Sequence, residues 1–169
     1  MSPLRTAAVL TVSDSSARGE RADLSGPVTA DLLRQNGFEV THQEIVPDDQ
    51  PTIESSLVRL TEQVQLIVTT GGTGIADRDV TPEATRTVCS KLIEGIPERM
   101  RSEGMASTSN AILSRGVCGV RGRTLILNLP GSPTGASESL LAVIEILPHA
   151  LDLLAGKTVH DDAHPQHDE

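Results

Sequence analysis

The fold of this 169-residue chain is decided by one stretch, residues 66–84, with the sequence LIVTTGGTGIADRDVTPEA. Its first residues, 66–68, are apolar and predict a short buried strand. Its last residues predict the start of a helix, because Thr81 is a good N-cap and Pro82 fits the first helical position. Three glycines lie within residues 71–74. The stretch therefore predicts a strand, a glycine loop and a helix N-terminus in succession.

The glycine loop suits an anion. Glycine lets the backbone approach a ligand closely and adopt positive φ, and a helix N-terminus offers N–H groups to a phosphate. The loop is not a P-loop, because no Gly-Lys-Ser/Thr follows, and its glycine spacing is not that of a dinucleotide fingerprint. A tight turn without a ligand is the alternative, although a plain turn rarely needs three glycines, two threonines and a nearby aspartate. We therefore expect an anion site here.

Composition excludes several classes of function. A net charge of -9 argues against a nucleic-acid partner, which needs a basic surface, and Phe38 is the single aromatic residue, so base-stacking platforms are absent. Cys89 and Cys118 lack CxxC spacing and are predicted to be reduced core thiols. The N-terminus does not resemble a secretory signal, and no apolar run approaches the roughly 20 residues of a membrane span. We therefore expect a cytoplasmic protein with no membrane partner.

Strand and helix patterns alternate up to the glycine loop and the helix that follows it. The predicted strands are 6–12, 38–46 and 66–68, and the predicted helices are 27–36, 51–64 and one from Pro82. This order predicts an α/β fold with a three-layer, mostly parallel sheet and helices on both faces. Ligands of such sheets bind beyond the carboxyl ends of the strands, where polar segments follow each of these three strands.

The second half of the chain is less regular. Its predicted elements are helices at 87–93, 98–105 and 138–147, a turn or helix at 148–154, an interruption at 94–97, short strand pieces at 111–115 and 116–123, and a firm strand at 124–129. Ser132 is predicted to cap a helix and Pro133 to begin it. Residues 157–169 are acidic and contain histidines, so we predict a disordered tail after one domain over residues 1–156.

Seven short motifs follow one another along the chain. They are VSD at 12–14, DLSGP at 23–27, VPDD at 46–49, TGGTG at 70–74, RDVTPEA at 78–84, LSR at 113–115 and NLPGSP at 128–133. Together they resemble the signature of the molybdopterin-binding family, which includes the MogA/MoaB-type molybdopterin adenylyltransferases and the G domains of gephyrin. The resemblance covers residues 6–156 and implies a three-layer α/β domain that forms homotrimers, with hexamers among the MoaB-type members.

The resemblance implies an enzyme of molybdenum cofactor biosynthesis. The terminal phosphate of molybdopterin would attack the α-phosphate of ATP, with Mg²⁺ as cofactor, giving adenylyl-molybdopterin and pyrophosphate. A molybdenum-insertion protein would be a partner. One alternative is a non-catalytic molybdopterin-binding or scaffold protein of the MoaB type. Another is a different phosphate-ester enzyme on the same fold, such as the CinA-like relatives, although those chains are usually longer.

Asp48 and Asp79 are the predicted catalytic and Mg²⁺-binding residues. Each lies in a polar loop after a predicted strand, and Mg²⁺ prefers carboxylates together with phosphate oxygens. By resemblance they match the two functionally important aspartates of the family. Other roles remain open at this point. Asp48 also fits a turn or a cap, and Asp79 also fits a salt bridge with Arg78 or a cap near Thr81. Asp49 is better explained as the N-cap of the following helix.

The resemblance also assigns the two substrates to residues. The predicted molybdopterin-binding residues are Thr70, Gly71, Gly72, Thr73, Gly74, Ser114 and Arg115. The predicted nucleotide-binding residues are Ser13, Asp14, Asp23, Ser25, Asn128, Pro130, Gly131 and Ser132. From the residue types alone, Ser114 fits an ordinary strand-end hydroxyl and Arg115 a solvated surface arginine. Likewise, Asp23 and Ser25 fit the start of a helix.

Overall fold

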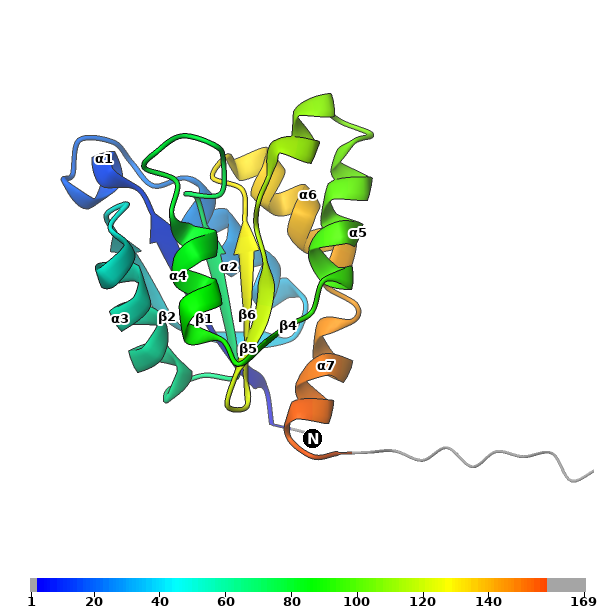
Figure 1. Cartoon of the computed structure of the whole chain (residues 1–169). Coiled ribbons are helices and arrows are strands. Elements are labelled where there is room, and N and C mark those ends of the chain that lie inside the picture. The colour runs from blue at the N-terminus through cyan, green and yellow to red at the C-terminus, as the bar shows by residue number, and fades with distance from the viewer. Residues whose placement is uncertain (1–2, 158–169) are drawn as a thin grey trace, which may run out of the picture.

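The computed structural model describes residues 3–157 and places a six-stranded sheet between two layers of helices (Figure 1). The strands are β1 (Arg5–Val12), β2 (Phe38–Val46), β3 (Leu66–Thr70), β4 (Lys91–Leu92), β5 (Cys118–Arg121) and β6 (Thr124–Leu129), and their order across the sheet is β2-β1-β3-β6-β5-β4. Strands β2, β1, β3 and β6 are parallel, whereas β5 is antiparallel to β6 and β4 to β5. The predicted three-layer, mostly parallel α/β fold is confirmed.

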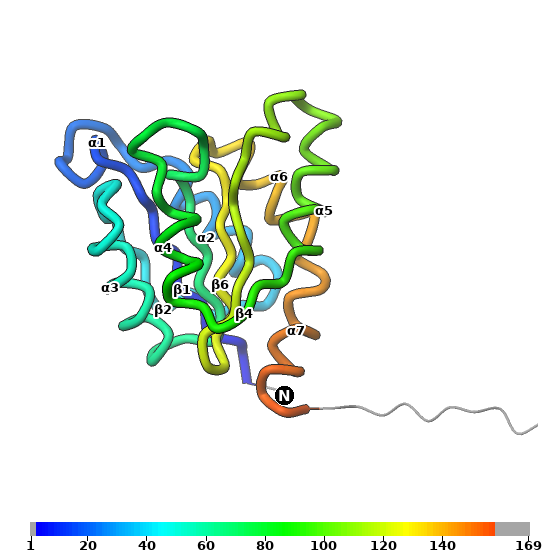
Figure 2. Tube along the Cα trace, in the orientation of Figure 1, coloured from blue at the N-terminus to red at the C-terminus, as the bar shows by residue number. Residues whose placement is uncertain are grey.

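The helices cover both faces of the sheet. They are α1 (Asp14–Ala17), α2 (Ser25–Gln35), α3 (Gln50–Thr61), α4 (Thr81–Val88), α5 (Gly95–Gly104), the 3-10 helix η1 (Ser109–Leu113), α6 (Pro133–Val143) and α7 (Leu147–Leu154). Helices α3 and α4 pack on one face, and α2, α5, α6 and α7 on the other (Figure 2). None of the helices in residues 3–157 has the length and apolarity that crossing a membrane requires.

The core consists of aliphatic side chains that alternate between the two faces. In β1, Ala7 and Val9 face α2 and α6, whereas Ala8 and Leu10 face α3 and α4, because successive side chains of a strand point to opposite sides. Both faces are covered, so β1, β3 and β6 are buried at nearly every position instead of alternating between buried and exposed residues. Burying one leucine such as Leu10 stabilises the fold by roughly 1.5–3 kcal/mol.

The margin of the sheet beyond β6 differs from the prediction. The helix predicted to reach Ile93 ends at Val88, and Lys91 pairs with Val120 as part of β4. Pairing with β5 overrides the weak local preference of this short segment, so the helix prediction was wrong. The predicted interruption at 94–97 was also wrong: α5 begins at Gly95 and accommodates Pro97 in its first turn, where a missing N–H costs nothing.

Two further predictions in the second half need correction. Residues 109–113 form the helix η1 instead of a strand piece, and the hydroxyl of Thr108 caps it by accepting a hydrogen bond from the N–H of Asn110. The helix predicted over 138–147 is divided between α6, which ends at Val143, and α7, which begins at Leu147. The tail predicted over 157–169 lies outside the described residues, apart from Lys157.

The strand order creates a divergence beside β1. From β1 the chain crosses first to β2 on one side and later to β3 on the other. The connections that leave the carboxyl ends of β1 and β3 therefore separate, and such a switch point opens a crevice. Ser13 follows β1 and Gly71 follows β3, so two of the predicted polar segments lie at this crevice.

Candidate active site

A cleft of about 450 Å³ lies at the switch point, beyond the carboxyl ends of β1 and β3. Four parts of the chain line it: residues 11–25, Asp48, the segment 70–79 after β3, and the turn 131–133 after β6. Eleven of the predicted site residues lie on its walls, namely Ser13, Asp14, Asp23, Ser25, Asp48, Thr70, Gly71, Gly72, Asp79, Gly131 and Ser132. The predicted convergence of polar segments is therefore found in the structure.

The glycine loop needs glycine at two positions. Gly71 and Gly72 have φ of 90° and 68°, a region that other residues rarely adopt. A Cβ atom at Gly71 would overlap the carbonyl oxygen of Val12, and one at Gly72 would overlap the hydroxyl of Thr81. Within residues 3–157, the N–H groups of Gly72, Thr73 and Gly74 have no hydrogen-bond acceptor. A row of unpaired N–H groups beside a helix N-terminus forms a cradle suited to an anion.

Thr81 does not cap α4 as predicted. Val80 is the N-cap and makes no side-chain capping bond, whereas Thr81 is the first helical residue and is fully buried. The hydroxyl of Thr81 donates to the carbonyl of Gly71 over 3.0 Å, and its N–H donates to the carbonyl of Gly72 over 3.1 Å. The threonine therefore ties the helix to the glycine loop, and Figure 2 shows the loop arching above the N-terminal end of α4.

Asp48 is held by a reciprocal pair of hydrogen bonds with Asp14. The N–H of Asp14 donates to Oδ2 of Asp48 over 3.0 Å, and the N–H of Asp48 donates to Oδ1 of Asp14 over 2.8 Å. Burial raises the pKa of Asp48, and the negative charges of Asp14 and Asp79 raise it further, against the opposing effects of the Asp14 N–H and of Arg78. The neighbouring Asp49 caps α3, as predicted, by accepting from the N–H of Thr52.

Asp79 lines the cleft and also closes its own loop. Its Oδ2 accepts a hydrogen bond from the N–H of Ala76 over 3.0 Å, and the same oxygen would lie 2.8 Å from a Cβ atom added at Gly74. The alternative salt bridge between Asp79 and Arg78 is not found among the ion pairs of residues 3–157. The carboxylate thus has a fixed position, with its second oxygen left for another partner.

The donor set at this end of the cleft fits a divalent cation. Burial is the main cause of the raised pKa of Asp48, and the negative charges of Asp14 and Asp79 add to it. No group of three or more His, Cys, Asp or Glu side chains in the described chain is placed to bind a metal by itself. Mg²⁺ commonly takes one or two carboxylates and completes its shell with phosphate oxygens and water. Asp48 and Asp79 match the number and type of carboxylates that such an ion takes from a protein.

The opposite wall of the cleft is built around Asp23. Its Oδ2 accepts from the hydroxyl of Thr11 over 2.7 Å, and its Oδ1 accepts from the N–H of Gly26 over 3.0 Å, so Asp23 supports the start of α2. The hydroxyls of Ser25 and Thr70 are 2.9 Å apart. The hydroxyl of Ser13 caps α1 by accepting from the N–H of Ser16. The predicted helix-start roles of this wall are therefore present, and its hydroxyls also face the cleft.

The turn after β6 meets the glycine loop. A Cβ atom at Gly131 would lie 3.2 Å from the Cα of Gly71, so the two turns touch through glycine. Ser132 caps α6 as predicted, by accepting from the N–H of Gly135 over 3.0 Å. Pro130 lies apart from the main cleft, on a smaller cavity of about 170 Å³ that shares Ser132 and Ser114 with its neighbours.

Asn128 does not line the cleft. It is fully buried, and its amide donates to the hydroxyls of Thr69 and Thr85 over 3.1 and 3.0 Å. Its carbonyl oxygen accepts from the N–H of Val117 over 3.2 Å. These bonds join β3, α4 and the entrance to β5. The predicted side-chain contact between Asn128 and a nucleotide is therefore corrected: the residue positions the strands beneath the site.

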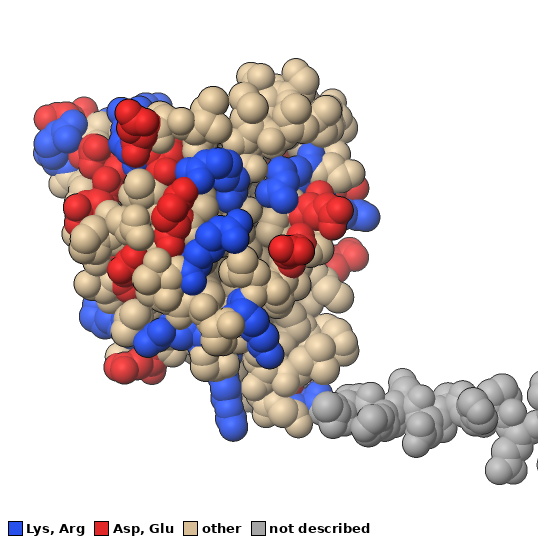
Figure 3. Space-filling view, viewed as in Figure 1, with Lys and Arg blue, Asp and Glu red and all other residues tan. Residues whose placement is uncertain are grey.

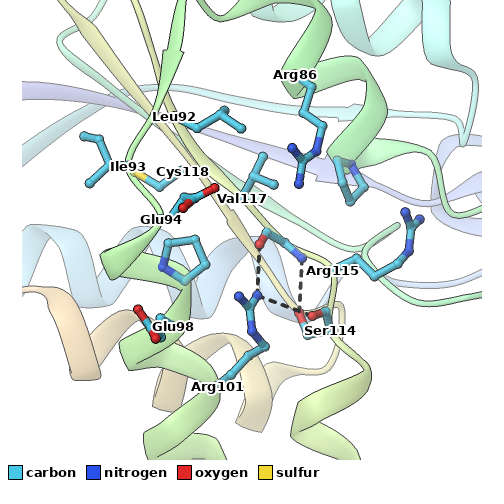
Figure 4. A pocket seen from close by; sticks show the side chains of 13 residues that line it. Arg86, Leu92, Ile93, Glu94, Glu98, Arg101, Ser114, Arg115, Val117 and Cys118 are labelled. Atoms are coloured by element: carbon cyan, nitrogen blue, oxygen red, sulfur yellow. Dashed lines mark hydrogen bonds between the residues drawn. The ribbon is translucent and has the colours of Figure 1, made fainter.

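Ser114 and Arg115 lie on a second cavity of about 540 Å³ between α4 and α5 (Figure 4). Arg86, Arg101 and Arg115 bring three guanidinium groups to its lining, and Figure 3 shows basic side chains gathered between these helices in an otherwise acidic protein. Arg115 is not the solvated arginine of the alternative interpretation, because it forms an ion pair with Glu83. Thr73, in the glycine loop, is buried.

Sequence reasoning missed three arginines of the main cleft. Arg18, Arg21 and Arg78 all line it, the first two from the loop after β1 and the third from the loop after β3. Arg18 is ion-paired with Glu20 at the surface. Their position in the sequence could have identified them, because they lie in loops that follow the predicted strands of a mainly acidic chain. Positive charge in such loops attracts a phosphate bound beyond the strand ends.

Comparison with known proteins agrees with this geometry. The family model described as a probable molybdopterin binding domain matches residues 8–149. A molybdopterin adenylyltransferase of Helicobacter pylori is 44% identical over 153 residues, covering 88% of this chain and 86% of that protein. One from Escherichia coli K12 is 38% identical over 140 residues, covering 80% of this chain and 71% of that protein.

Solved structures give the same result. The molybdopterin biosynthesis enzyme MoaB of Thermus thermophilus is 51% identical, with a TM-score of 0.86, over 91% of this chain and 98% of that chain. A CinA protein of Thermoplasma acidophilum is 19% identical with a TM-score of 0.66, over 84% of this chain and 97% of that chain, and shares the fold alone. On the match over residues 8–149 and these identities, the chain belongs to the molybdopterin-binding family.

Proposed function

We propose that this protein is a molybdopterin adenylyltransferase of molybdenum cofactor biosynthesis, which uses ATP and molybdopterin and releases pyrophosphate. The observation that carries the proposal is the glycine loop beside two carboxylates. Gly71 and Gly72 line the same cleft as Asp48 and Asp79, and the N–H groups of residues 72–74 in this loop have no acceptor within residues 3–157. The N–H cradle suits a phosphate, and the carboxylates suit the cation that accompanies ATP. The names of the relatives supply the identity of the substrates.

The glycine loop takes the terminal phosphate of molybdopterin in this proposal. The N–H groups of Gly72, Thr73 and Gly74 bind it, with Thr70 and Gly71 shaping the loop and Ser114 reaching it from the neighbouring cavity. An oxygen of this phosphate forms a bond to the α-phosphorus of ATP while the bond from that phosphorus to the β-phosphate oxygen breaks. Pyrophosphate then leaves. Such a reaction depends on in-line positioning and on neutralising charge, which rigid loops provide.

The nucleotide lies against the wall formed by the loop after β1 and the turn after β6. Ser13, Asp14 and Ser25 offer polar groups from the first, and Gly131 and Ser132 offer backbone and hydroxyl groups from the second. Asp23 supports this wall through Thr11 and Gly26 instead of needing to touch the nucleotide itself. Arg18, Arg21 and Arg78 bring positive charge towards the phosphates.

Asp48 and Asp79 would hold Mg²⁺. When bound there, the ion would neutralise charge on the phosphate oxygens. Asp48 binds a cation only when it is ionised, and its pKa is raised by burial and by its acidic neighbours. Metal affinity is therefore expected to fall as the pH is lowered, beginning at a higher pH than for an ordinary aspartate.

The decisive experiment combines turnover with binding. Purified protein, molybdopterin and Mg-ATP are expected to give adenylyl-molybdopterin and pyrophosphate. Asp79→Asn is expected to lower turnover by about 10²–10³-fold while the molybdopterin Kd changes by less than about threefold, because the lost charge acts mainly in the transition state. Asp77→Asn is the matched control, because Asp77 is exposed in the same loop and does not line the cleft.

The non-catalytic alternative makes the opposite prediction. A molybdopterin-binding scaffold protein would bind molybdopterin tightly and release no pyrophosphate. Tight binding without turnover in the wild-type protein would therefore contradict the enzyme proposal. If Asp79→Asn retained full turnover, the enzyme would stand but the role given to Asp79 would be wrong.

We also propose a cytoplasmic homotrimer that passes its product to a molybdenum-insertion protein. Exposed apolar side chains on one side of the sheet support self-association: Leu141 on α6, Ile146 in the following turn and Leu153 on α7 are 48–52% exposed. Light scattering in solution measures the mass directly and separates a trimer from a hexamer. A monomeric mass would overturn this part of the proposal.

A further inference from the structure

The segment 114–116 runs beside the glycine loop. It follows η1 and leads into β5, and the N–H of Arg115 donates to the carbonyl of Thr73 over 2.8 Å. The loop that carries the three unpaired N–H groups is therefore held in place by residues about 40 positions away in the sequence. Contacts of this kind fix a loop that has no regular secondary structure of its own.

The side chain of Arg115 holds the same loop at both ends. Its Nε donates to the carbonyl of Gly74 over 2.7 Å, and its Nη2 donates to the carbonyl of Asp79 over 2.8 Å. Nη1 forms an ion pair with Glu83 in the first turn of α4. This hydrogen bond raises the pKa of Arg115 and lowers that of Glu83. One guanidinium thus joins the glycine loop, the backbone of Asp79 and α4.

A second arginine holds the segment that carries the first. Nη1 of Arg101, on α5, donates to the carbonyl of Ser114 over 3.4 Å and to that of Gly116 over 3.3 Å, on either side of Arg115 (Figure 4). Figure 4 shows the Arg101 side chain reaching from α5 to these two carbonyls, while the side chain of Arg115 points away towards the loop. The two arginines therefore act in series between α5 and Asp79.

We propose that Arg101 and Arg115 form an arginine bracket that sets the position of Asp79 opposite Asp48. In this assignment Arg115 is a positioning residue and not a ligand of molybdopterin, because its donors are engaged with Gly74, Asp79 and Glu83. The inference rests on the proposed function, since it gives the bracket a role in the reaction for which Asp79 is needed. It adds a connection from α5 to the cleft that the family resemblance does not contain.

The planar fork of arginine is essential to this role. A guanidinium offers five N–H donors in fixed directions and here serves three acceptors at once, whereas a lysine ammonium is a single point of charge on a flexible stem. Arg115→Lys keeps the charge but loses the simultaneous contacts. We expect kcat to fall by about 10–100-fold, the scale of a displacement of about 1 Å, with a change of less than about threefold in the KM for molybdopterin.

The control is Arg86→Lys. Arg86 lines the same cavity as Arg101 and Arg115 but forms none of the ion pairs found within residues 3–157. Its replacement is expected to leave kcat unchanged. Circular dichroism and the Tm of both variants show whether either protein is merely unfolded. Loss of molybdopterin affinity in Arg115→Lys with an unchanged kcat would overturn the bracket and support a direct substrate contact.

A double-mutant cycle tests whether Arg115 acts through Asp79. If it does, the combined variant Arg115→Lys with Asp79→Asn loses about as much turnover as Asp79→Asn alone, because the second change disturbs a carboxylate that is already absent. If the two residues act independently, the two losses multiply, and that result would overturn the proposal. A general effect on folding would not produce the first pattern.

Amide hydrogen exchange separates failure of the bracket from failure of the proposed function. In the ligand-free protein, residues 73–79 are expected to exchange at least several-fold faster in Arg115→Lys than in the wild type, and Arg86→Lys is expected to leave the rate unchanged. If the wild type lacks turnover but exchange increases as expected, the bracket stands and the proposed function fails. Equal exchange in Arg115→Lys and the wild type would overturn the bracket, whatever the activity.

Discussion

The turns after β3 and β6 start from neighbouring parallel strands and end differently. Both lead from a buried strand to a helix with proline in its first turn, and they touch where Gly131 meets Gly71. After β6, Ser132 caps α6 within three residues of the strand end. After β3, the chain takes residues 71–80 to reach α4, and its N-cap makes no side-chain bond.

The difference shows how one turn keeps its N–H groups free while the other satisfies its own helix end. The turn after β6 satisfies its own helix end with a serine hydroxyl, which is the usual solution. The loop after β3 leaves the N–H groups of residues 72–74 without an acceptor in the described part of the chain, and Thr81 and Arg115 hold the loop instead. Its unpaired donors then remain available to a ligand.

The largest effect is expected from a substitution that prevents the loop after β3 from adopting its backbone conformation. In Gly72→Ala the new Cβ meets the hydroxyl of Thr81 in a residue with φ of 68°, so the loop has to move or Thr81 has to rotate away. We expect destabilisation of about 2–4 kcal/mol and loss of molybdopterin binding, because strain and a broken Thr81 bond add together. Chemical denaturation and a binding titration measure both.

Gly37→Ala is the matched control for backbone strain. Gly37 also has a positive φ, 85°, but a Cβ there meets no atom within 4 Å. It ends α2 far from the cleft, so its replacement should cost about 1 kcal/mol and leave molybdopterin affinity unchanged. Equal losses of affinity in both variants would show that the glycine loop is not the cradle, and would remove the distinction between the two turns.

A smaller effect is expected at the β6 turn. Ser132→Ala removes the cap of α6 and is expected to lower stability by about 1 kcal/mol, which corresponds to a decrease in Tm of roughly 2–4 °C for a domain of this size. Ser132→Thr keeps a hydroxyl and should retain most of the stability. Differential scanning calorimetry compares the two. If Ser132→Ala lowered the affinity for molybdopterin as strongly as Gly72→Ala does, both turns would belong to the phosphate cradle.

The parallel half of the molecule could be predicted because its local signals agree with its tertiary structure. The apolar runs that form β1 and β3 are buried on both faces, and the boundaries of β2 are those of its alternating pattern. Polar segments after these strands then had to meet at one edge of a parallel sheet. The cleft therefore followed from the order of elements, and the aspartates lay in it as predicted.

The margin of the sheet could not be predicted in the same way. Strand β4 has only two residues and forms because β5 lies beside it. The residues around β4 in the sequence therefore carry no signal that predicts a strand. The roles of Asn128 and Arg115 have the same origin. Asn128 is a polar residue inside an apolar strand, and the hydroxyls of Thr69 and Thr85 that satisfy it come from other elements. Tertiary contacts decide such positions.

The smallest effect concerns Asp48, which faces Gly72 and has no counterpart at the β6 turn. Burial and the charges of Asp14 and Asp79 raise its pKa in the folded protein above the unfolded value. The folded state then binds the proton more tightly, so the contribution of Asp48 to stability is greatest below its unfolded pKa and is lost as the pH rises through its folded pKa. In metal-free protein at pH 7, Asp48→Asn removes this unfavourable charge and is expected to raise the Tm by roughly 1–3 °C.

The pH dependence makes that prediction specific. The gain in Asp48→Asn should shrink as the pH is lowered towards the ordinary range of an aspartate, where the wild-type carboxyl is protonated and resembles the amide. Asp77→Asn, exposed in the same part of the molecule, should show no such pH-dependent gain. Thermal scans in a chelator at several pH values measure both. A Tm for Asp48→Asn below that of the wild type at pH 7 would contradict this prediction. It would mean that the hydrogen bond from the Asp14 N–H stabilises the ionised carboxylate by more than burial destabilises it. The carboxylate of Asp48 would then not lower the stability of the metal-free protein.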